Sequence, residues 1–145
     1  MSIRPFHEND FAAILEIYAK SKLDELNYER REFVLLPLEQ DHKRLAELQE
    51  SDIYVCEDKG VVGYGALFGS EIRALFVLPS CRGKGVGKLL LKHLLSCIGK
   101  SAVLYVAKSN VPAKSLYESF GFKVTEEFET TYNCVPVLAN KMVRA

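Results

Sequence analysis

Runs of apolar residues separated by turn signals predict several strands in the middle of the chain. Residues 53–57, 61–68 and 71–77 are rich in β-branched, aromatic and other apolar side chains. Asp58-Lys59-Gly60 separates the first two runs and Gly69-Ser70 separates the second and third, and both are turn sequences. We therefore predict an antiparallel meander of three strands here.

Apolar residues at helical spacing predict helices before and after this meander in the sequence. The best example begins after Asn9 or Asp10 and places Phe11, Ile14 and Tyr18 on one face, toward the core. Residues 21–36 remain open, since a short helix over 24–33 or an extended end at 33–36 both fit. The predicted helices cover residues 11–20, 38–49, 86–98 and 109–120, and the further strands cover residues 2–6, 102–106, 122–129 and 132–142.

Composition indicates a single soluble domain over residues 1–145. Hydrophobic residues make up 48% and charged residues 26% of the chain, which is ordinary for a globular protein. No apolar run approaches 18 residues and the start carries no apolar signal segment, so we expect a cytoplasmic protein without a membrane span. The four scattered cysteines predict reduced thiols, and the three separated histidines argue against a metal site.

Charge is balanced overall but is divided along the chain. The 19 basic and 19 acidic residues cancel, yet acidic residues dominate residues 24–58 and basic residues dominate 73–123. A basic segment can indicate nucleic-acid binding. Here it flanks a glycine-rich loop without any RNA-binding motif, so a phosphorylated cofactor explains it better. The acidic segment either forms a solvated helical face or attracts a cationic acceptor.

The glycine-rich loop follows the strand that Pro79 ends, and it opens the helix that starts at Val86. The first amides of a helix lack internal partners and make that end electropositive. Glycines let a phosphate approach the backbone closely. Arg82, Lys84 and Lys88 add positive charge to the same turn. The loop is therefore a candidate pyrophosphate site.

Two motifs narrow the choice of ligand. The loop fits neither the P-loop pattern nor the dinucleotide fingerprint, but Arg82-Gly83-Lys84-Gly85-Val86-Gly87 matches R-x-x-G-x-G. Downstream stands the pattern Asn110-x-x-Ala113-x-x-x-Tyr117-x-x-x-Gly121-Phe122. Together they resemble the acyl-CoA loop and the following helix of the GNAT N-acetyltransferase superfamily.

The resemblance extends over nearly the whole chain, in the order β-α-α-β-β-β-α-β-α-β-β. It implies an α+β, sandwich-like fold with a mixed, mostly antiparallel sheet of six to seven strands flanked by helices. It also implies that the central strands splay beside the loop and that acetyl-CoA binds there as co-substrate. The implied cofactor-binding residues are Leu75, Phe76, Val77, Arg82, Gly83, Lys84, Gly85, Val86, Gly87, Lys88, Asn110, Ala113 and Tyr117.

The same resemblance suggests two catalytic residues. Tyr117 is expected to donate a proton to the departing CoA thiolate, since a phenol of pKa near 10 can donate to a thiolate whose conjugate acid has a pKa near 8.5. Glu71 is the candidate general base, directly or through a water, because it stands at the start of the strand before the loop, where histone acetyltransferases of this superfamily carry a catalytic glutamate in a similar Glu-Ile pair. The alternatives are a packing role for Tyr117, an ion pair of Glu71 with Arg73 or a nearby lysine, and a simple helix cap for Asn110.

We therefore expect transfer of acetyl from acetyl-CoA to a primary amine of a small molecule or peptide, by direct attack in a ternary complex. Backbone amides near Val77 are expected to polarise the thioester carbonyl. Cys134 has no identifiable base beside it and is expected to be structural. The rival functions are an acyl-CoA-binding regulatory module and a nucleic-acid-binding protein. We expect no nucleic acid or membrane partner, and a monomer or homodimer.

Overall fold

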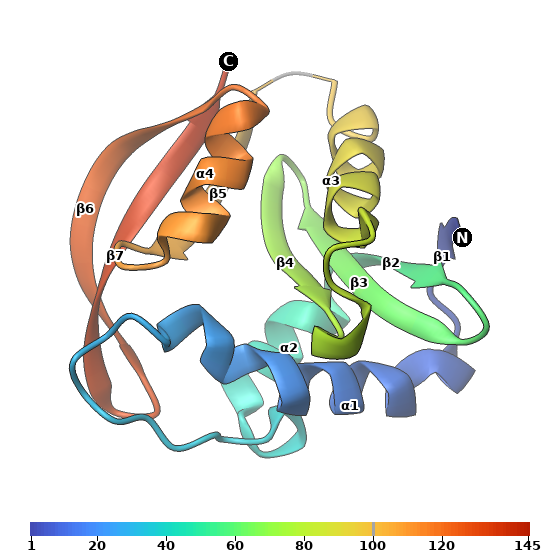
Figure 1. Ribbon diagram of the computed structural model, residues 1–145, viewed down its shortest axis with the longest axis horizontal. Coiled ribbons are helices and arrows are strands. Elements are labelled where there is room, and N and C mark those ends of the chain that lie inside the picture. The colour runs from blue at the N-terminus through green and yellow to red at the C-terminus, as the bar shows by residue number, and fades with distance from the viewer. Residues whose placement is uncertain (100) are drawn as a thin grey trace.

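One sheet of seven strands organises the protein, in the order β1-β2-β3-β4-β5-β7-β6. The structure is a computed structural model that describes residues 1–99 and 101–145. Strands β4 and β5 are parallel and the other neighbours are antiparallel, which confirms the predicted mixed, mostly antiparallel sheet (Figure 1). The strands are β1 (Ser2–Pro5), β2 (Asp52–Glu57), β3 (Val61–Phe68), β4 (Glu71–Val77), β5 (Ala102–Ala107), β6 (Phe122–Tyr132) and β7 (Val135–Arg144).

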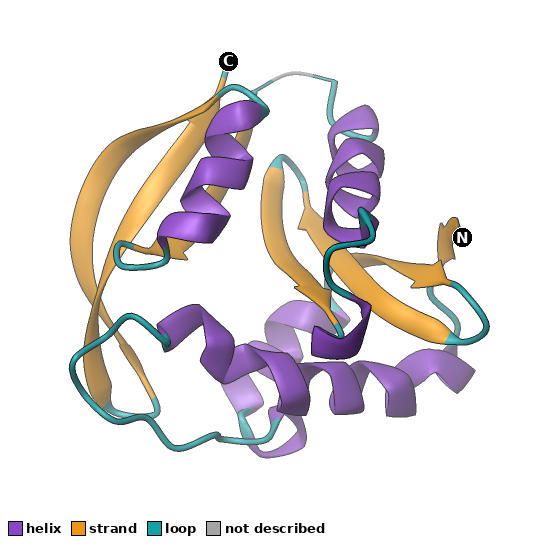
Figure 2. Cartoon of the chain, in the orientation of Figure 1, coloured by secondary structure: helices purple, strands orange, loops and turns teal. Residues whose placement is uncertain are grey.

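Helices cover both faces of this sheet, as Figure 2 shows. The first two α-helices pack on one face and the last two on the other. The α-helices are α1 (Phe11–Ser21), α2 (His42–Gln49), α3 (Val86–Ser96) and α4 (Val111–Ser119). Four short 3₁₀-helices lie in the connecting segments: η1 (Glu8–Asp10), η2 (Lys22–Leu26), η3 (Leu38–Gln40) and η4 (Pro79–Cys81).

The core is divided by the sheet into two main clusters. On the α1 side, Ile14 and Tyr18 pack against Tyr64 and Phe76 of the central strands. On the other side α3 lies very close to β3, because a Cβ built at Gly65 would come within 2.8 Å of a Leu94 methyl group. A larger residue at Gly65 would push α3 away from the sheet.

Asp10 has the predicted position before the first α-helix, but its side chain does not have the predicted capping role. It precedes α1 as expected, yet its carboxylate makes no capping bond to that helix. Instead it accepts hydrogen bonds of 2.8 and 2.9 Å from the Arg4 guanidinium and one of 2.8 Å from the backbone N–H of His7. The Arg4 hydrogen bond, helped by the His7 amide, lowers the pKa of Asp10 to about 2.

Three other predicted boundaries are wrong. The helix predicted over 38–49 is two pieces, because Asp41 leaves helical geometry and accepts from the backbone N–H of Arg44 to begin α2. The helix predicted to continue to Ile98 ends at Ser96. The turn of the last hairpin is Asn133-Cys134, with φ of 47° and 67°, so β6 continues to Tyr132. Of residues 21–36, Ser21 ends α1, and the remaining residues contain only η2 as regular structure.

The sheet opens between β4 and β5, and this opening positions the site. Only two residue pairs join the two strands, Glu71 with Val103 and Ile72 with Leu104. A register shift in the β3–β4 pairing leaves Arg73 as an extra residue just beyond them. The remaining part of β4 therefore diverges from β5, as the family resemblance implied.

Candidate active site

A cavity of about 1030 Å³ lies where β4 and β5 separate. Its walls come from β4, the glycine-rich loop, α4, the β6–β7 hairpin, and the segments around η2 and α2. Both predicted catalytic residues, Glu71 and Tyr117, line it. So does every predicted cofactor-binding residue except the exposed Lys84: Leu75, Phe76, Val77, Arg82, Gly83, Gly85, Val86, Gly87, Lys88, Asn110, Ala113 and Tyr117.

The glycine-rich loop forms the rim of the cavity at the start of α3. Gly83 and Gly85 have φ of 79° and 84°, a left-handed conformation that disfavours other residues. A Cβ built at either position meets no atom within 4 Å, so the space in front of the loop is open. The loop thus turns the unpaired amides at the start of α3 toward space that a phosphate could fill.

Arg82 already has a partner on the opposite rim. Its guanidinium nitrogen lies 2.7 Å from a carboxylate oxygen of Asp24 in η2. Both side chains are well exposed, so solvent weakens this ion pair and a phosphate could compete for Arg82. Asp24 lies in the segment that the sequence left open, and no motif pointed to it.

Tyr117 lies on α4 with its ring edge-on to Phe122, the ring centroids being 5.9 Å apart. Burial raises the pKa of its phenol far above the usual value, and the negative charge of Glu25 raises it further. The phenol therefore keeps its proton at neutral pH. Tyr117 packs against Phe122 and also lines the cavity. Both the packing role and the proton-donor role considered for it therefore have a structural basis.

Glu71 lies at the inner end of the cavity, where β4 and β5 still pair. Its carboxylate is 3.5 Å from Nε of Arg73, and 31% of its side chain is exposed. The ion pair between Glu71 and Arg73 that was considered as an alternative is therefore present, and Glu71 also lines the cavity. Asn110 is similar, because its side chain accepts from the backbone N–H of Ala113 as a helix cap while it lines the cavity.

Other chemistries find less support. Among residues 1–99 and 101–145 there is no cluster of three or more His, Cys, Asp or Glu side chains arranged to hold a metal ion. Within the same residues no helix has both the length and the apolar character needed to span a membrane. The four cysteines are unpaired, and Cys134 is exposed in the last hairpin turn.

A family model described as an acetyltransferase (GNAT) domain matches residues 49–124, more than half of the chain. The chain belongs to the GNAT family. This confirms the resemblance that the two sequence motifs carried.

Individual relatives agree with the family. The peptidyl-lysine N-acetyltransferase YjaB of Salmonella typhimurium is 35% identical over 77 residues, which cover 53% of this chain and 52% of that protein. YjaB of Escherichia coli is 37% identical over 84 residues, 57% of this chain and 56% of that protein. The chain thus spans about half the length of the curated relatives it matches.

A solved structure of the GNAT fold extends the match to nearly the whole chain. The putative acetyltransferase yncA from Salmonella typhimurium, solved with its cofactor acetyl-CoA, covers 99% of this chain and 92% of its own, with a TM-score of 0.73 and 24% identity. At this identity the likeness establishes the fold alone. The seven-stranded arrangement is therefore the GNAT fold from end to end.

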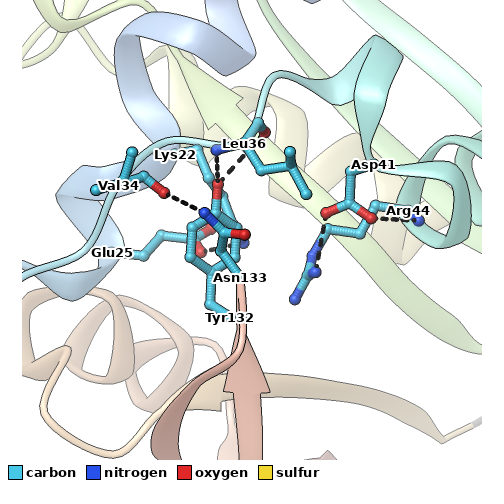
Figure 3. Close-up of polar contacts among 8 residues, drawn as sticks. All are labelled: Lys22, Glu25, Val34, Leu36, Asp41, Arg44, Tyr132 and Asn133. Carbon is cyan, nitrogen blue, oxygen red and sulfur yellow. Dashed lines mark hydrogen bonds and ion pairs between the residues drawn. The ribbon is translucent and has the colours of Figure 1, made fainter.

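Sequence reasoning missed one wall of this GNAT cavity. There the ring of Tyr132 lies between two cations, with Lys22 Nζ 5.4 Å and the Arg44 guanidinium carbon 5.1 Å from the ring centroid (Figure 3). Lys22 also lies 2.7 Å from a carboxylate oxygen of Glu25. The spacing of Lys22 and Glu25, opposite charges three residues apart, was the one sequence signal for this pair.

A smaller chamber of about 150 Å³ adjoins this wall. It is lined by Tyr18, whose hydroxyl is the one buried side-chain polar atom without a hydrogen-bond partner in the described part of the chain. Lys22, Glu25 and Arg44 line both the chamber and the main cavity. An unpartnered buried hydroxyl is costly, so the chamber suits a water or a polar group of a ligand.

Proposed function

We propose that this GNAT chain is an N-acetyltransferase that moves the acetyl group of acetyl-CoA to a primary amine. The observation that carries the proposal is the opening between β4 and β5. It brings the glycine-rich loop, the free part of β4 and Tyr117 to one cavity of about 1030 Å³. The pyrophosphate would bind at the loop, and pantetheine would run along Leu75, Phe76 and Val77.

The proposed reaction is direct attack in a ternary complex. Glu71, directly or through a water, accepts a proton from the amine, which is protonated at neutral pH. Backbone amides near Val77 stabilise the negative charge on the thioester oxygen. Tyr117, which burial keeps protonated at neutral pH, gives its proton to the departing thiolate and takes up the second proton of the attacking nitrogen, while Glu71 releases the first proton to solvent.

The acceptor is proposed to be a lysine-like primary amine of a small molecule or peptide. Support comes from the YjaB relatives, which are named peptidyl-lysine N-acetyltransferases. The acceptor would enter from the side of η2, α2 and the β6–β7 hairpin, whose residues form the cavity wall opposite the loop.

Calorimetric titration with acetyl-CoA tests the cofactor step, and a thiol-release assay with a panel of amines and lysyl peptides tests transfer. Micromolar binding with thiol release that depends on an amine supports the proposal. Binding without release for any acceptor favours the acyl-CoA-binding regulatory module instead. Absence of acetyl-CoA binding overturns the proposal.

A further inference from the structure

Lys22 differs from an ordinary surface lysine because its amine lies inside the proposed reaction cavity. Its side chain is only 13% exposed and lines both the main cavity and the adjoining chamber. Lys20, two residues earlier, forms an ion pair of the same length with Glu16, yet its side chain is 58% exposed and it does not line either cavity. Each lysine therefore forms an ion pair with a glutamate, but only Lys22 lies in the cavity.

Three aromatic rings hold the Lys22 amine in place. Nζ lies 5.9, 5.8 and 5.4 Å from the ring centroids of Tyr18, Phe76 and Tyr132. These rings come from α1, β4 and β6, so elements far apart in the chain converge on one lysine side chain. Phe76 belongs to the part of β4 along which the thioester is proposed to lie. The amine is thus fixed beside that strand.

A proton acceptor for this amine is also present. The Glu25 carboxylate is 2.7 Å from Nζ, within the reach that a general base requires. Glu25 and the proposed acid Tyr117 line the same cavity, and the negative charge of Glu25 adds to the effect of burial in raising the pKa of Tyr117. A lysine amine, a base and an acid thus line one cavity.

We infer that Lys22 is an acetylation site of the chain itself, with Glu25 as the base and acetyl-CoA in the same cavity as donor. The inference rests on the proposed function and adds an acceptor to it. The carboxylate of Glu25 takes one proton from the ammonium group, and the neutral amine attacks the thioester carbonyl carbon. The C–N bond forms, the C–S bond breaks, and the thiolate takes up the second amine proton through Tyr117. The first proton leaves Glu25 for solvent.

The modification would limit the activity of the protein. Acetyl-Lys22 carries no charge, so it loses the ion pair with Glu25 and the attraction of the three rings. Its acetamide remains in the cavity beside Phe76, where an external acceptor has to reach the thioester. Acetylation of Lys22 should therefore slow transfer to external acceptors.

The test compares Lys22 with Lys20 in one protein. The intact chain is incubated with isotope-labelled acetyl-CoA, without acceptor, and the acetyl occupancy of each lysine is followed by peptide mass spectrometry. Uncatalysed acetylation favours the exposed Lys20, whereas transfer inside the cavity favours Lys22 by about tenfold or more, as expected for a positioned amine. The Lys22 rate should be independent of protein concentration, since donor and acceptor share one molecule.

Two variants separate catalysis from simple exposure. Glu25→Gln should slow acetylation of Lys22 by about 100-fold, the lower range for loss of a general base, and leave Lys20 unchanged. Glu16→Gln is the matched control and should leave Lys22 unchanged. Equal occupancy of both lysines, or a Lys22 rate proportional to protein concentration, overturns the inference. If external amines are acetylated while Lys22 is not, the inference fails and the proposed function stands. Absence of acetyl-CoA binding removes both.

Discussion

The hydroxyl of Tyr132 accepts a 2.8 Å hydrogen bond from the backbone N–H of Leu36, 96 positions earlier in the chain. This bond joins the end of β6 to the segment that precedes η3 (Figure 3). Asn133 adds a second link, since its amide donates to the Val34 carbonyl at 3.0 Å. The acceptor side of the cavity is therefore closed by contacts between distant segments.

Removing the Tyr132 hydroxyl should loosen this wall. We expect Tyr132→Phe to lower the free energy of unfolding by about 1 kcal/mol, the usual contribution of one hydrogen bond. Amide exchange at Leu36 should become faster, because its N–H loses its partner. Tyr105→Phe is the control, since Tyr105 is half exposed and packs against Phe128 by its ring. Equal effects of the two variants on amide exchange at Leu36 would show that the Tyr132–Leu36 hydrogen bond does not stabilise this wall.

Tyr117 should matter for turnover more than for binding. We expect Tyr117→Phe to reduce kcat of acetyl transfer by about 100-fold or more, the range for loss of a general acid. Affinity for acetyl-CoA should change little, because the ring and its contact with Phe122 remain. Steady-state kinetics and titration calorimetry on the same protein measure the two effects. A parallel loss of turnover and affinity would indicate a packing role.

A negative charge on the glycine-rich loop should prevent cofactor binding. We expect Gly85→Glu to abolish measurable acetyl-CoA affinity, because the carboxylate would occupy and repel the pyrophosphate position. Gly60→Glu is a matched control, since Gly60 also has a positive φ of 122° and no atom near its Cβ position, but it lies in the β2–β3 turn. Both variants carry the same kind of backbone strain. Unchanged affinity in Gly85→Glu would overturn the loop assignment.

Asp10 should make stability depend on pH in the acid range. Its folded pKa of about 2 lies below the ordinary 3.8, so its stabilising effect is complete above about pH 4 and disappears as pH falls toward 2. We expect Asp10→Asn to lower the free energy of unfolding by about 1 to 2 kcal/mol at pH 7. Urea unfolding at several pH values should show the two proteins converging near pH 2.

The control for this experiment is Glu57→Gln. Glu57 is the second partner of Arg4, at 3.3 Å, and is 46% exposed, so its removal should change stability much less. A difference between wild type and Asp10→Asn that stays constant from pH 7 to pH 2 would contradict the Arg4–Asp10 explanation.

The sequence predicted those parts of the fold that local patterns specify. The strands over 61–68 and 71–77 have their predicted bounds, since turn residues flank strongly apolar runs. The last hairpin turn was missed because Asn133 and Cys134 adopt positive φ without a glycine. Its position depends instead on the tertiary contacts of Tyr132 and Asn133 with residues 34–36.

The site likewise has parts that local sequence patterns specify and parts that depend on tertiary contacts. The loop and α4 carry motifs with fixed spacing, so their residues were predicted and all but Lys84 line the cavity. Glu25 and Lys22 belong to a segment without strong periodicity, and the three rings around Lys22 come from separate elements. No local pattern encodes such a convergence. It follows from the three-dimensional packing alone.

Because only Glu71–Val103 and Ile72–Leu104 join β4 to β5, the sheet consists of two leaves that meet along a short junction. One leaf holds β1 to β4 and the other β5 to β7. Changing the angle between them disturbs two residue pairs at most, whereas every other ladder stays intact. The Tyr132–Leu36 hydrogen bond joins the second leaf, at the end of β6, to the segment that precedes η3. We therefore expect the width of the gap available to a thioester to depend on this hydrogen bond as well as on the residues that line the gap.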